Sequence, residues 1–401
     1  MAYLLPLIIL LAAFCFSIIS KKIEASYLTL PMFFTALGFS IQFFVPDIAH
    51  AYANNEYILL LAELTLILVL FSDAARVNIS ILKQNIFIPT RMLLIGMPLT
   101  ILLGTFFAYL VSPNEPWPLA LLLAAMLAPT DAALGQSLIN NNNVPESLRV
   151  TANVESGLND GFAVPVVTVA AILTAQAYGT MHMEDDNLVA FTLKQIFLAP
   201  VAGVFIGAIG GKILLKAKSS GLIATPHKAL VFLCLALGAY FFASLIGGNG
   251  FIAAFVAGLA FGYVSKKHDR DVYTFMESQG QLLTIVSFMT FGAILLPIGL
   301  AHATMNTFLL AIAFLTIVRI LPIWISLIGT KLPFSHKLTL GWFGPRGLAS
   351  ILFSIIILEH YDIPHVDELL ACIVLTVVMS IILHGLSAKP IVDMFKRSKN
   401  K

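Results

Sequence analysis

The chain has 401 residues, of which 59% are hydrophobic and only 11% are charged, and its formal net charge is +2. Soluble globular domains carry about 25% charged residues, so this composition excludes a protein with an ordinary water-facing surface. Apolar runs of about 18–28 residues recur along the sequence, long enough to cross the hydrocarbon core of a bilayer as helices. We therefore expect an all-α membrane protein with many crossings, surrounded by lipid.

Hydropathy predicts thirteen spans in chain order. Their ranges are 2–20, 27–45, 57–75, 87–112, 117–139, 148–176, 191–215, 228–246, 249–265, 272–299, 303–328, 337–358 and 366–388. The first run has its charges after it rather than before it, the reverse of a secretory signal, so we expect it to be retained. Residues 391–401 are expected to form a short basic cytoplasmic tail, and no soluble domain is expected.

The basic residues predict an orientation, because inner loops of membrane proteins are enriched in Lys and Arg. With the N-terminus outside and the C-terminus inside, 20 of the 23 basic residues fall on the inner side, while ten acids fall in outer loops. The charge pattern thus reflects topology, and no nucleic-acid partner is expected. Cys15, Cys234 and Cys372 fall within spans and predict neither a disulfide framework nor a metal cluster.

Two spans contain helix-breaking residues near their centres. Span 5 contains Pro129, and span 12 contains the stretch Gly344-Pro345-Arg346-Gly347. Backbone groups freed at such breaks are tolerated only inside protein or beside a water-filled cavity. Glycine and proline are also common in ordinary membrane helices. Because both breaks lie beside charged residues, we favour a transporter with inverted repeats, spans 1–6 and 8–13, joined by span 7.

Four acidic residues lie deep within spans. They are Glu63, Asp131, Glu155 and Asp160. A charge at the bilayer centre costs at least about 3 kcal/mol, so such residues mark ion pathways or ion pairs. Helix rise puts the last three about 10–18 Å from the inner ends of their spans, and Arg319 and Arg346 at about 14 Å. A shared layer near the midplane indicates one functional site.

The side chains around Asp160 predict a site for a hard cation. On span 6, Ser156 shares a helix face with Asp160, and Glu155 shares the adjacent face with Asn159. Oxygen atoms are the ligands that hard cations prefer, and broken helices bind Na⁺ in other transporters. The expected Na⁺ ligands are Asp160, Asp131, Thr130 and Ser156. No cofactor is expected beyond the transported Na⁺ or Li⁺ and H⁺.

Glu155 needs a cationic partner, and the sequence offers two. Arg319 lies at a similar depth, and we favour it as the partner in a structural ion pair, because removing either member would leave a buried charge. Arg346 follows Gly-Pro at the span 12 break, where it is expected to compensate helix-end carbonyls or the excess of acids. Both arginines remain candidates for Glu155.

Three motifs occur in order along the sequence: "APTDAALGQSLINNNNVPESLR", "NVESGLNDG" and "GWFGPRGLASI". Together they resemble the monovalent cation:proton antiporter superfamily, most closely the bacterial sodium/proton antiporters of the NhaP type, which are related to animal sodium/proton exchangers. The first resembles the broken-helix Pro-Thr/Ser-Asp segment, the second the Glu-Ser-x-Leu-Asn-Asp motif, and the third the Gly-x-Arg-Gly segment. The combination extends from span 3 to span 12 with two weaker echoes.

The resemblance implies a core ion-transport domain, residues 86–189 and 301–390, and a dimerisation domain, residues 1–85 and 190–300, in a homodimer. It implies that Asp160 carries the cation or the proton, and that Thr130, Asp131, Ser156 and Asn159 support the site. It implies a Glu155–Arg319 pair, and Glu63 reaching the site through water. Asn159 before Asp160 resembles the electroneutral branch of the superfamily, which exchanges one cation for one proton.

We therefore predict a Na⁺(Li⁺)/H⁺ antiporter of a bacterial cell membrane, working by alternating access, and not an enzyme. The alternatives are a K⁺/H⁺ antiporter of the same family, a Na⁺-coupled organic anion symporter on the same architecture, a channel, and an intramembrane hydrolase that uses two acids. The Thr130-Asp131 and Asn159-Asp160 pairs argue against the symporter. A channel would need a turnover far above about 10³ per second, beyond what conformational change allows a carrier.

Overall fold

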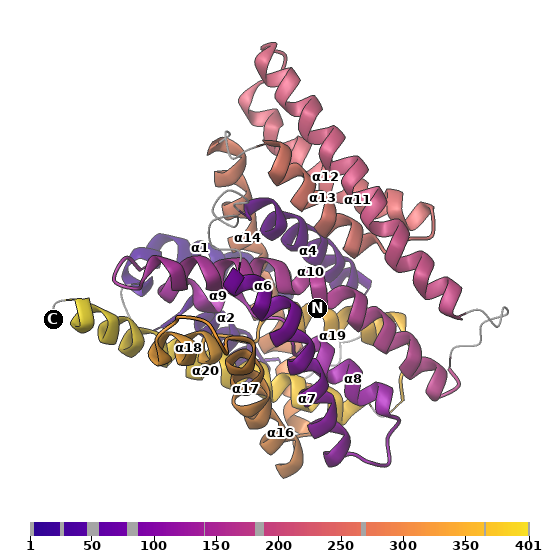
Figure 1. The fold of residues 1–401 in the computed structure, drawn as a ribbon, viewed down its shortest axis with the longest axis vertical. Coiled ribbons are helices and arrows are strands. Elements are labelled where there is room, and N and C mark those ends of the chain that lie inside the picture. The colour runs from indigo at the N-terminus through magenta and orange to yellow at the C-terminus, as the bar shows by residue number, and fades with distance from the viewer. Residues whose placement is uncertain are drawn as a thin grey trace.

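A computed structural model describes residues 4–24, 28–45, 56–77, 87–139, 141–180, 188–265, 270–364 and 366–399. Every regular element within these ranges is helical (Figure 1). Asp47 and Glu184–Asp186, four of the acids in the predicted charge asymmetry, lie outside the described residues.

The helices follow the predicted spans closely. Spans 1–4 correspond to α1 (Leu4–Glu24), α2 (Leu30–Ser40) with η1 (Ile41–Phe43), α4 (Glu56–Arg76), and α6 (Phe87–Arg91), η2 (Met92–Gly96) and α7 (Met97–Val111). Spans 5–9 correspond to α8 (Trp117–Met126) with α9 (Ala132–Ile139), α10 (Glu146–Ala177), α11 (Leu188–Ser219), α12 (Thr225–Leu245) and α13 (Gly250–Ser265). Spans 10–13 correspond to α14 (Arg270–Thr290), η3 (Phe291–Leu295) and α15 (Leu296–Ala301); α16 (Met305–Leu315) and α17 (Ile317–Ser326); α18 (Phe334–Trp342) and α19 (Leu348–His360); and α20 (Val366–Lys399).

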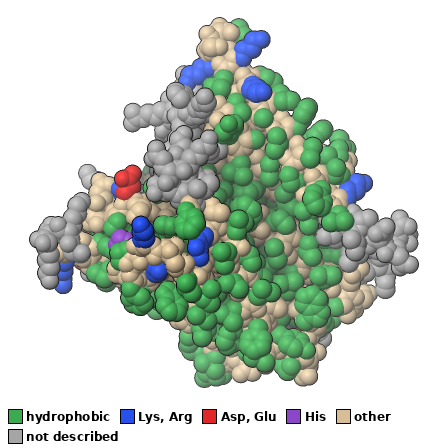
Figure 2. Space-filling model, viewed as in Figure 1, with side chains coloured by type: hydrophobic (Ala, Val, Ile, Leu, Met, Phe, Trp, Pro, Cys, Tyr) green, Lys and Arg blue, Asp and Glu red, His purple; other side chains and the backbone are tan. Residues whose placement is uncertain are grey.

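Among the described residues, eight helices are long and apolar enough to cross a membrane. Apolar helices of 10–17 residues coincide with the other predicted spans, so the all-α membrane fold is confirmed while the number of crossings stays a prediction. Figure 2 shows hydrophobic side chains over most of the visible face, with Lys and Arg gathered at its edges. Exposed apolar side chains such as Phe197, Val201 and Phe205 on α11 suit contact with lipid rather than water.

Three features differ from the predicted spans. The turns η2 and η3 are π-helical, and α16 and α17 are separated at Thr316. The last helix does not end near residue 388 but continues through Pro390 to Lys399, so most of the expected tail is helical. The added turns bury Val392 and Phe395 in an apolar cluster with Leu340, which gives the extension a hydrophobic reason to form.

The long helix α10 holds a central position. It packs against α8, α9 and α19, and also against α4 and α13. Figure 1 shows α11, α12 and α13 in the upper part of the molecule and α7, α8 and α16 in the lower part. On α13, Gly258 and Gly262 face the backbone carbonyls of Phe71 and Ala75 so closely that any Cβ would overlap them. Small residues thus let α4 and α13 pack tightly beside α10.

Candidate functional site

The middle of α10 carries four polar side chains away from water. Glu155, Ser156, Asn159 and Asp160 are all buried, and Asp160 is 7% exposed. They occur within a continuous 32-residue helix, so helical spacing fixes their relative positions. The next residue, Gly161, lies against the ring of Phe255 on α13, leaving no room for a Cβ there. The site is therefore enclosed by apolar packing on the α13 side.

The two interrupted segments meet beside α10. The first interruption covers residues 127–131 and the second covers residues 343–347. The backbone N–H of Asp131 donates to the carbonyl of Pro345 at 2.8 Å. Ser350 Oγ on α19 donates to the carbonyl of Met126 at the end of α8, at 2.7 Å. Backbone groups left without helical partners at the two breaks are thus satisfied by hydrogen bonds between the two interrupted segments.

Asp131 caps two helices at once. Its Oδ1 accepts from the backbone N–H of Ala133 at 2.7 Å, and its Oδ2 accepts from the backbone N–H of Leu348, also at 2.7 Å. These amides belong to the first turns of α9 and α19, where N–H groups lack helical partners and the helix dipole is positive. At Gly347 any Cβ would overlap the Asp131 carboxylate, so glycine makes this contact possible.

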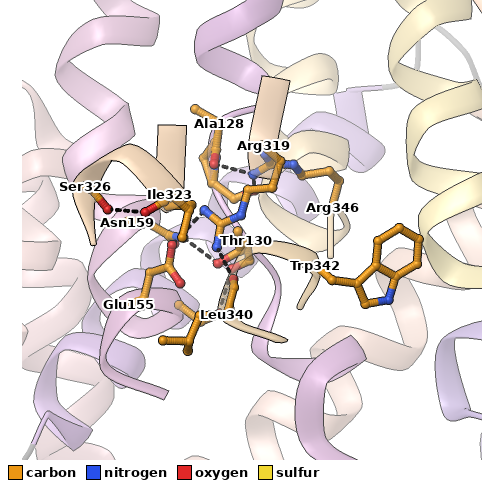
Figure 3. A network of polar contacts seen from close by, with 12 residues as sticks. Ala128, Thr130, Glu155, Asn159, Arg319, Ile323, Ser326, Leu340, Trp342 and Arg346 are labelled. Carbon is orange, nitrogen blue, oxygen red and sulfur yellow. Dashed lines mark hydrogen bonds and ion pairs between the residues drawn. The ribbon is translucent and has the colours of Figure 1, made fainter. Parts of the chain in front are cut away.

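Arg346 places a positive charge at a helix C-terminus, whereas Asp131 places a negative charge at two helix N-termini. The side chain is fully buried, and its Nη1 donates to the carbonyl of Pro129 at 2.8 Å and to that of Ala128. Both carbonyls follow the C-terminal end of α8, where the helix dipole is negative. The guanidinium of the second break therefore offsets the negative end of α8, and Figure 3 shows its contact with the carbonyl of Ala128.

Glu155 lies against Arg319. The distance from Glu155 Oε1 to Arg319 Nη1 is 2.7 Å, and both side chains are almost fully buried. At Gly344 any Cβ would overlap the Arg319 guanidinium, so the second break also makes room for this pair. Of the two arginines the sequence offered, the structure puts Arg319 beside Glu155 and Arg346 on the backbone carbonyls (Figure 3).

Thr130 joins the first break to α10. Ser156 Oγ donates to the backbone carbonyl of Thr130 at 2.7 Å, and Asn159 Nδ2 donates to its Oγ1 at 2.5 Å. These bonds use the hydroxyl donor of Ser156 and one of the two N–H donors of the Asn159 amide. The Oδ1 atom of Asn159 is buried and has no hydrogen-bond partner among the described residues.

Asp160 differs from the other deep charges. Its Oδ1 is also buried without a hydrogen-bond partner in the described part of the chain. Two further acids, Asp73 and Asp131, lie close enough to act electrostatically on its carboxyl. The site therefore concentrates negative charge and accepting oxygen atoms, which suits a proton or a small cation.

Asp73 on α4 is a site residue that the sequence reasoning missed. It lies near the inner end of its predicted span and is not among the four deep acids of the sequence analysis, yet it is half-buried and lies near Asp160 and Asp131. The backbone carbonyl of Asp73 lies 3.5 Å from the position that a Cβ on Gly157 would occupy, so α4 runs directly past the α10 motif. The sequence signal was an acid in an otherwise apolar stretch, "VLFSDAAR".

Glu63 lies elsewhere on α4. Helix rise puts it about 15 Å from Asp73 along the helix axis. Its Oε1 is 3.3 Å from Nε2 of His360, at the C-terminal end of α19. The side chain of His360 is 46% exposed, and that of Glu63 is 20% exposed. The structure thus brings Thr130, Asp131, Ser156, Asn159 and Asp160 together and leaves Glu63 apart from them.

The donor atoms at this site are oxygens. No group of three or more His, Cys, Asp or Glu side chains within the described residues is placed to hold a metal ion. The available atoms are carboxylate, amide and hydroxyl oxygens, which favour hard cations. A monovalent ion held by few oxygens beside a titratable carboxyl can be displaced by a proton.

The sequence matches the family described as "sodium/hydrogen exchanger, transmembrane" over residues 8–394. A relative, K(+)/H(+) antiporter NhaP2 of Shewanella sp. (strain ANA-3), is 25% identical over 300 residues, covering 74% of this chain and 50% of that protein. Na(+)/H(+) antiporter 2 of Zygosaccharomyces rouxii is 27% identical over 266 residues, covering 62% of this chain and 32% of that protein. The chain thus spans about half the length, or less, of these curated relatives.

Among solved structures, the fold is similar to the sodium proton antiporter MjNhaP1 from Methanocaldococcus jannaschii at pH 8. The TM-score is 0.75 at 23% identity, and the match covers 95% of this chain and 97% of that one. At this identity the likeness establishes the fold. The family match over nearly the whole sequence confirms the resemblance seen in the motifs: the chain belongs to the transmembrane sodium/hydrogen exchangers of the monovalent cation:proton antiporter superfamily.

Proposed function

We propose that this chain is a secondary active antiporter that exchanges Na⁺ or Li⁺ for H⁺, with the cation and the proton competing for Asp160. The observation that carries the proposal is the contrast between Asp160 and its neighbours. Asp131, Glu155, Arg319 and Arg346 each bond to backbone or to one another, while Asp160 Oδ1 is buried and unpartnered among the described residues. Relatives named as antiporters, rather than enzymes, support the same class.

The chemistry of exchange follows from the cost of burying charge. A charged carboxylate in a low-dielectric layer is unfavourable, and either H⁺ or Na⁺ removes the net charge of Asp160. The loaded site is therefore cheaper to move across the barrier than the empty one, which limits leak. The oxygens of Asp131 and Ser156, and Thr130 with the Asn159 amide, are the proposed supporting ligands. Because Asp131 already accepts two backbone N–H groups, its contribution to the cation is mainly electrostatic.

We further propose the architecture that would move this site. Residues 86–189 and 301–390 form the moving core, and residues 1–85 and 190–300 form a dimerisation domain in a homodimer. The chain crosses a bacterial cell membrane thirteen times, with spans 1–6 and 8–13 as inverted repeats. The distribution of basic residues supports an N-terminus outside and a C-terminus inside. The bonds among Thr130, Glu155, Arg319 and Arg346 support this division, because all of them join elements of the proposed core.

The transported ion has two candidates. The likeness to a Na(+)/H(+) antiporter and to a sodium proton antiporter supports Na⁺. The likeness to K(+)/H(+) antiporters supports K⁺. The single aspartate after Asn159 supports electroneutral exchange of one cation for one proton, since a second titrating acid at that position is absent from the motif.

Transport in proteoliposomes tests the proposal. A pH gradient is imposed, and its dissipation is followed after addition of Na⁺, Li⁺ or K⁺, with the membrane potential clamped and unclamped. We expect cation-dependent dissipation that does not change on clamping and is abolished in Asp160→Asn. The exposed Asp367→Asn serves as the matched control and should behave as the unmodified protein. Unchanged exchange by Asp160→Asn would falsify the assignment.

A further inference from the structure

A buried histidine on α20 contacts the second helix break, and the sequence motifs do not include it. His384 is fully buried, as is Ser380, one helical turn before it on the same face of α20. His384 Nε2 lies 2.9 Å from the carbonyl of Trp342, the last residue of α18. Its Nδ1 lies 3.1 Å from Ser380 Oγ. These contacts bring a polar pair from α20 to the edge of the interrupted segment.

The same pair reaches the other side of the break. The backbone N–H of Arg346 donates to Ser380 Oγ at 2.7 Å. Trp342 offers a carbonyl, so the facing Nε2 atom of His384 must carry a proton to bond with it. A neutral imidazole with its proton on Nε2 bonds to both Trp342 and the Ser380 hydroxyl, because Ser380 then accepts from Arg346 and donates its own proton to Nδ1. The carbonyl of Ser380 also lies 3.0 Å from Nδ1, but in this tautomer the ring does not donate to it. One chain of hydrogen bonds thus runs from Arg346 N–H to Trp342 C=O through α20.

This chain of hydrogen bonds fixes the backbone of the second break, which contacts the first break beside the ion site. Between its two ends lie Phe343, Gly344 and Pro345, and the carbonyl of Pro345 accepts from the backbone N–H of Asp131. The Arg346 side chain holds the carbonyls before Thr130. A shift of the second break would therefore move the first break, and with it the Thr130 hydroxyl, which accepts a hydrogen bond from Asn159.

We propose that Ser380 and His384 are positioning residues that fix the second break, and through it the cation affinity of the Asp160 site. The inference rests on the proposed function. His384 completes the balance of helix ends at the crossing: Arg346 holds the C-terminal carbonyls beyond α8, Asp131 holds the N-termini of α9 and α19, and His384 holds the C-terminal carbonyl of α18. Neither Ser380 nor His384 is proposed to touch the ion.

Packing at the same place must be separated from hydrogen bonding. The rings of Trp342 and His384 lie 5.0 Å apart, and Trp342 Nε1 donates to Ser387 Oγ at 2.9 Å. In Figure 3 the Trp342 indole points away from the Glu155–Arg319 pair. A substitution that keeps a ring but removes the Nε2 donor isolates the hydrogen bond, and one that keeps an N–H donor without a ring isolates the packing.

The test compares His384→Phe with His384→Gln in proteoliposomes, measuring the apparent KM for Na⁺ and the maximal rate. We expect His384→Phe to raise KM about tenfold, which corresponds to about 1.4 kcal/mol, and to change the maximal rate less. His384→Gln, which can donate to Trp342 and accept from Ser380, should restore KM to within about threefold. Ser387→Ala, on the same helix, is the matched control and should leave KM unchanged.

Two outcomes overturn the inference: an unchanged KM in His384→Phe, or equal defects in the Phe and Gln variants. If His384→Phe does not fold, Ser380→Ala decides, because it keeps the imidazole and removes the acceptor of Arg346 N–H. It should raise KM by a similar factor, and an unchanged KM counts against the proposal. Failure of the proposed function is distinct, since the unmodified protein would then show no cation-dependent dissipation of the pH gradient.

Discussion

Asp131 lies before α9 in the first break, yet its Oδ2 atom accepts a hydrogen bond from Leu348 N–H, the first residue of α19, at 2.7 Å. A carboxylate from one half of the chain thus caps a helix in the other half. This contact joins the two breaks and keeps Thr130 beside α10. The stability of the crossing and the geometry of the ion site therefore depend on the same side chain.

Asp131→Ala should destabilise the protein by about 2–4 kcal/mol, because it removes the caps of two helices and each cap contributes about 1–2 kcal/mol. Asp131→Asn should cost less, since an amide oxygen accepts from only one of the two helices. Thermal unfolding of the purified protein in detergent measures both. Asp393→Ala, an exposed acid on α20, is the control and should be neutral. Equal stability of the Asp131→Ala and control variants contradicts the capping role.

The Glu155–Arg319 pair predicts strong non-additivity. Either Glu155→Leu or Arg319→Leu should cost about 3–5 kcal/mol, because each leaves a buried charge without its partner. The double variant should recover most of that loss, since no unpaired charge remains. A double-mutant cycle on thermal stability gives the coupling energy. Additive losses in the double variant would mean that the two side chains do not act as a pair.

Two glycine-to-alanine substitutions should change the stability of the protein in opposite directions. At Gly347 a Cβ overlaps the Asp131 carboxylate, so Gly347→Ala should displace Asp131 and lower both stability and transport. At Gly238, inside α12, no heavy atom lies within 4 Å of the Cβ position. Gly238→Ala should therefore stabilise by about 0.5–1 kcal/mol, the usual gain in a helix interior. Unfolding curves of the two variants, with transport rates, check the contrast. A tolerated Gly347→Ala would contradict the tight crossing.

The contact of Glu63 with His360 predicts an energetic link between α4 and α19. Glu63 Oε1 lies 3.3 Å from His360 Nε2, and both side chains are partly exposed, so the contribution is at most about 1 kcal/mol. Glu63→Gln should therefore lower thermal stability by no more than this amount, and should have little effect when His360 is already replaced by Gln. A double-mutant cycle on thermal unfolding measures the coupling. Equal losses in the two backgrounds would contradict the contact.

The helices and their breaks could be predicted because each follows from local sequence. Apolar runs mark the spans, and Pro129 and the Gly-Pro-Arg-Gly stretch mark the interruptions. Helix rise was enough to put Asp131, Glu155 and Asp160 in one layer. The spans, their breaks and the depth of a residue in the membrane can each be read from a single segment of the sequence.

The partners of the charged groups could not be predicted in the same way, because they depend on how separate helices rotate and cross. Arg319 and Arg346 share a depth, and the sequence does not specify which one faces Glu155. The capping of two helices by Asp131 requires the crossing itself. Asp73 lies in a weaker echo of the family and His384 outside the three main motifs, and their places depend on the close packing of α4 and α20 against the site.

Calorimetric titration of Na⁺ into the purified protein, repeated in buffers of different ionisation enthalpy from pH 5 to 9, tests competition at Asp160 most directly. If one carboxyl takes either ligand, the apparent Kd for Na⁺ rises tenfold for each unit of pH decrease on the acid side. In that range each bound Na⁺ releases one proton, and at alkaline pH both effects disappear. A Kd that is independent of pH, with Na⁺ bound and no proton released, would contradict this account.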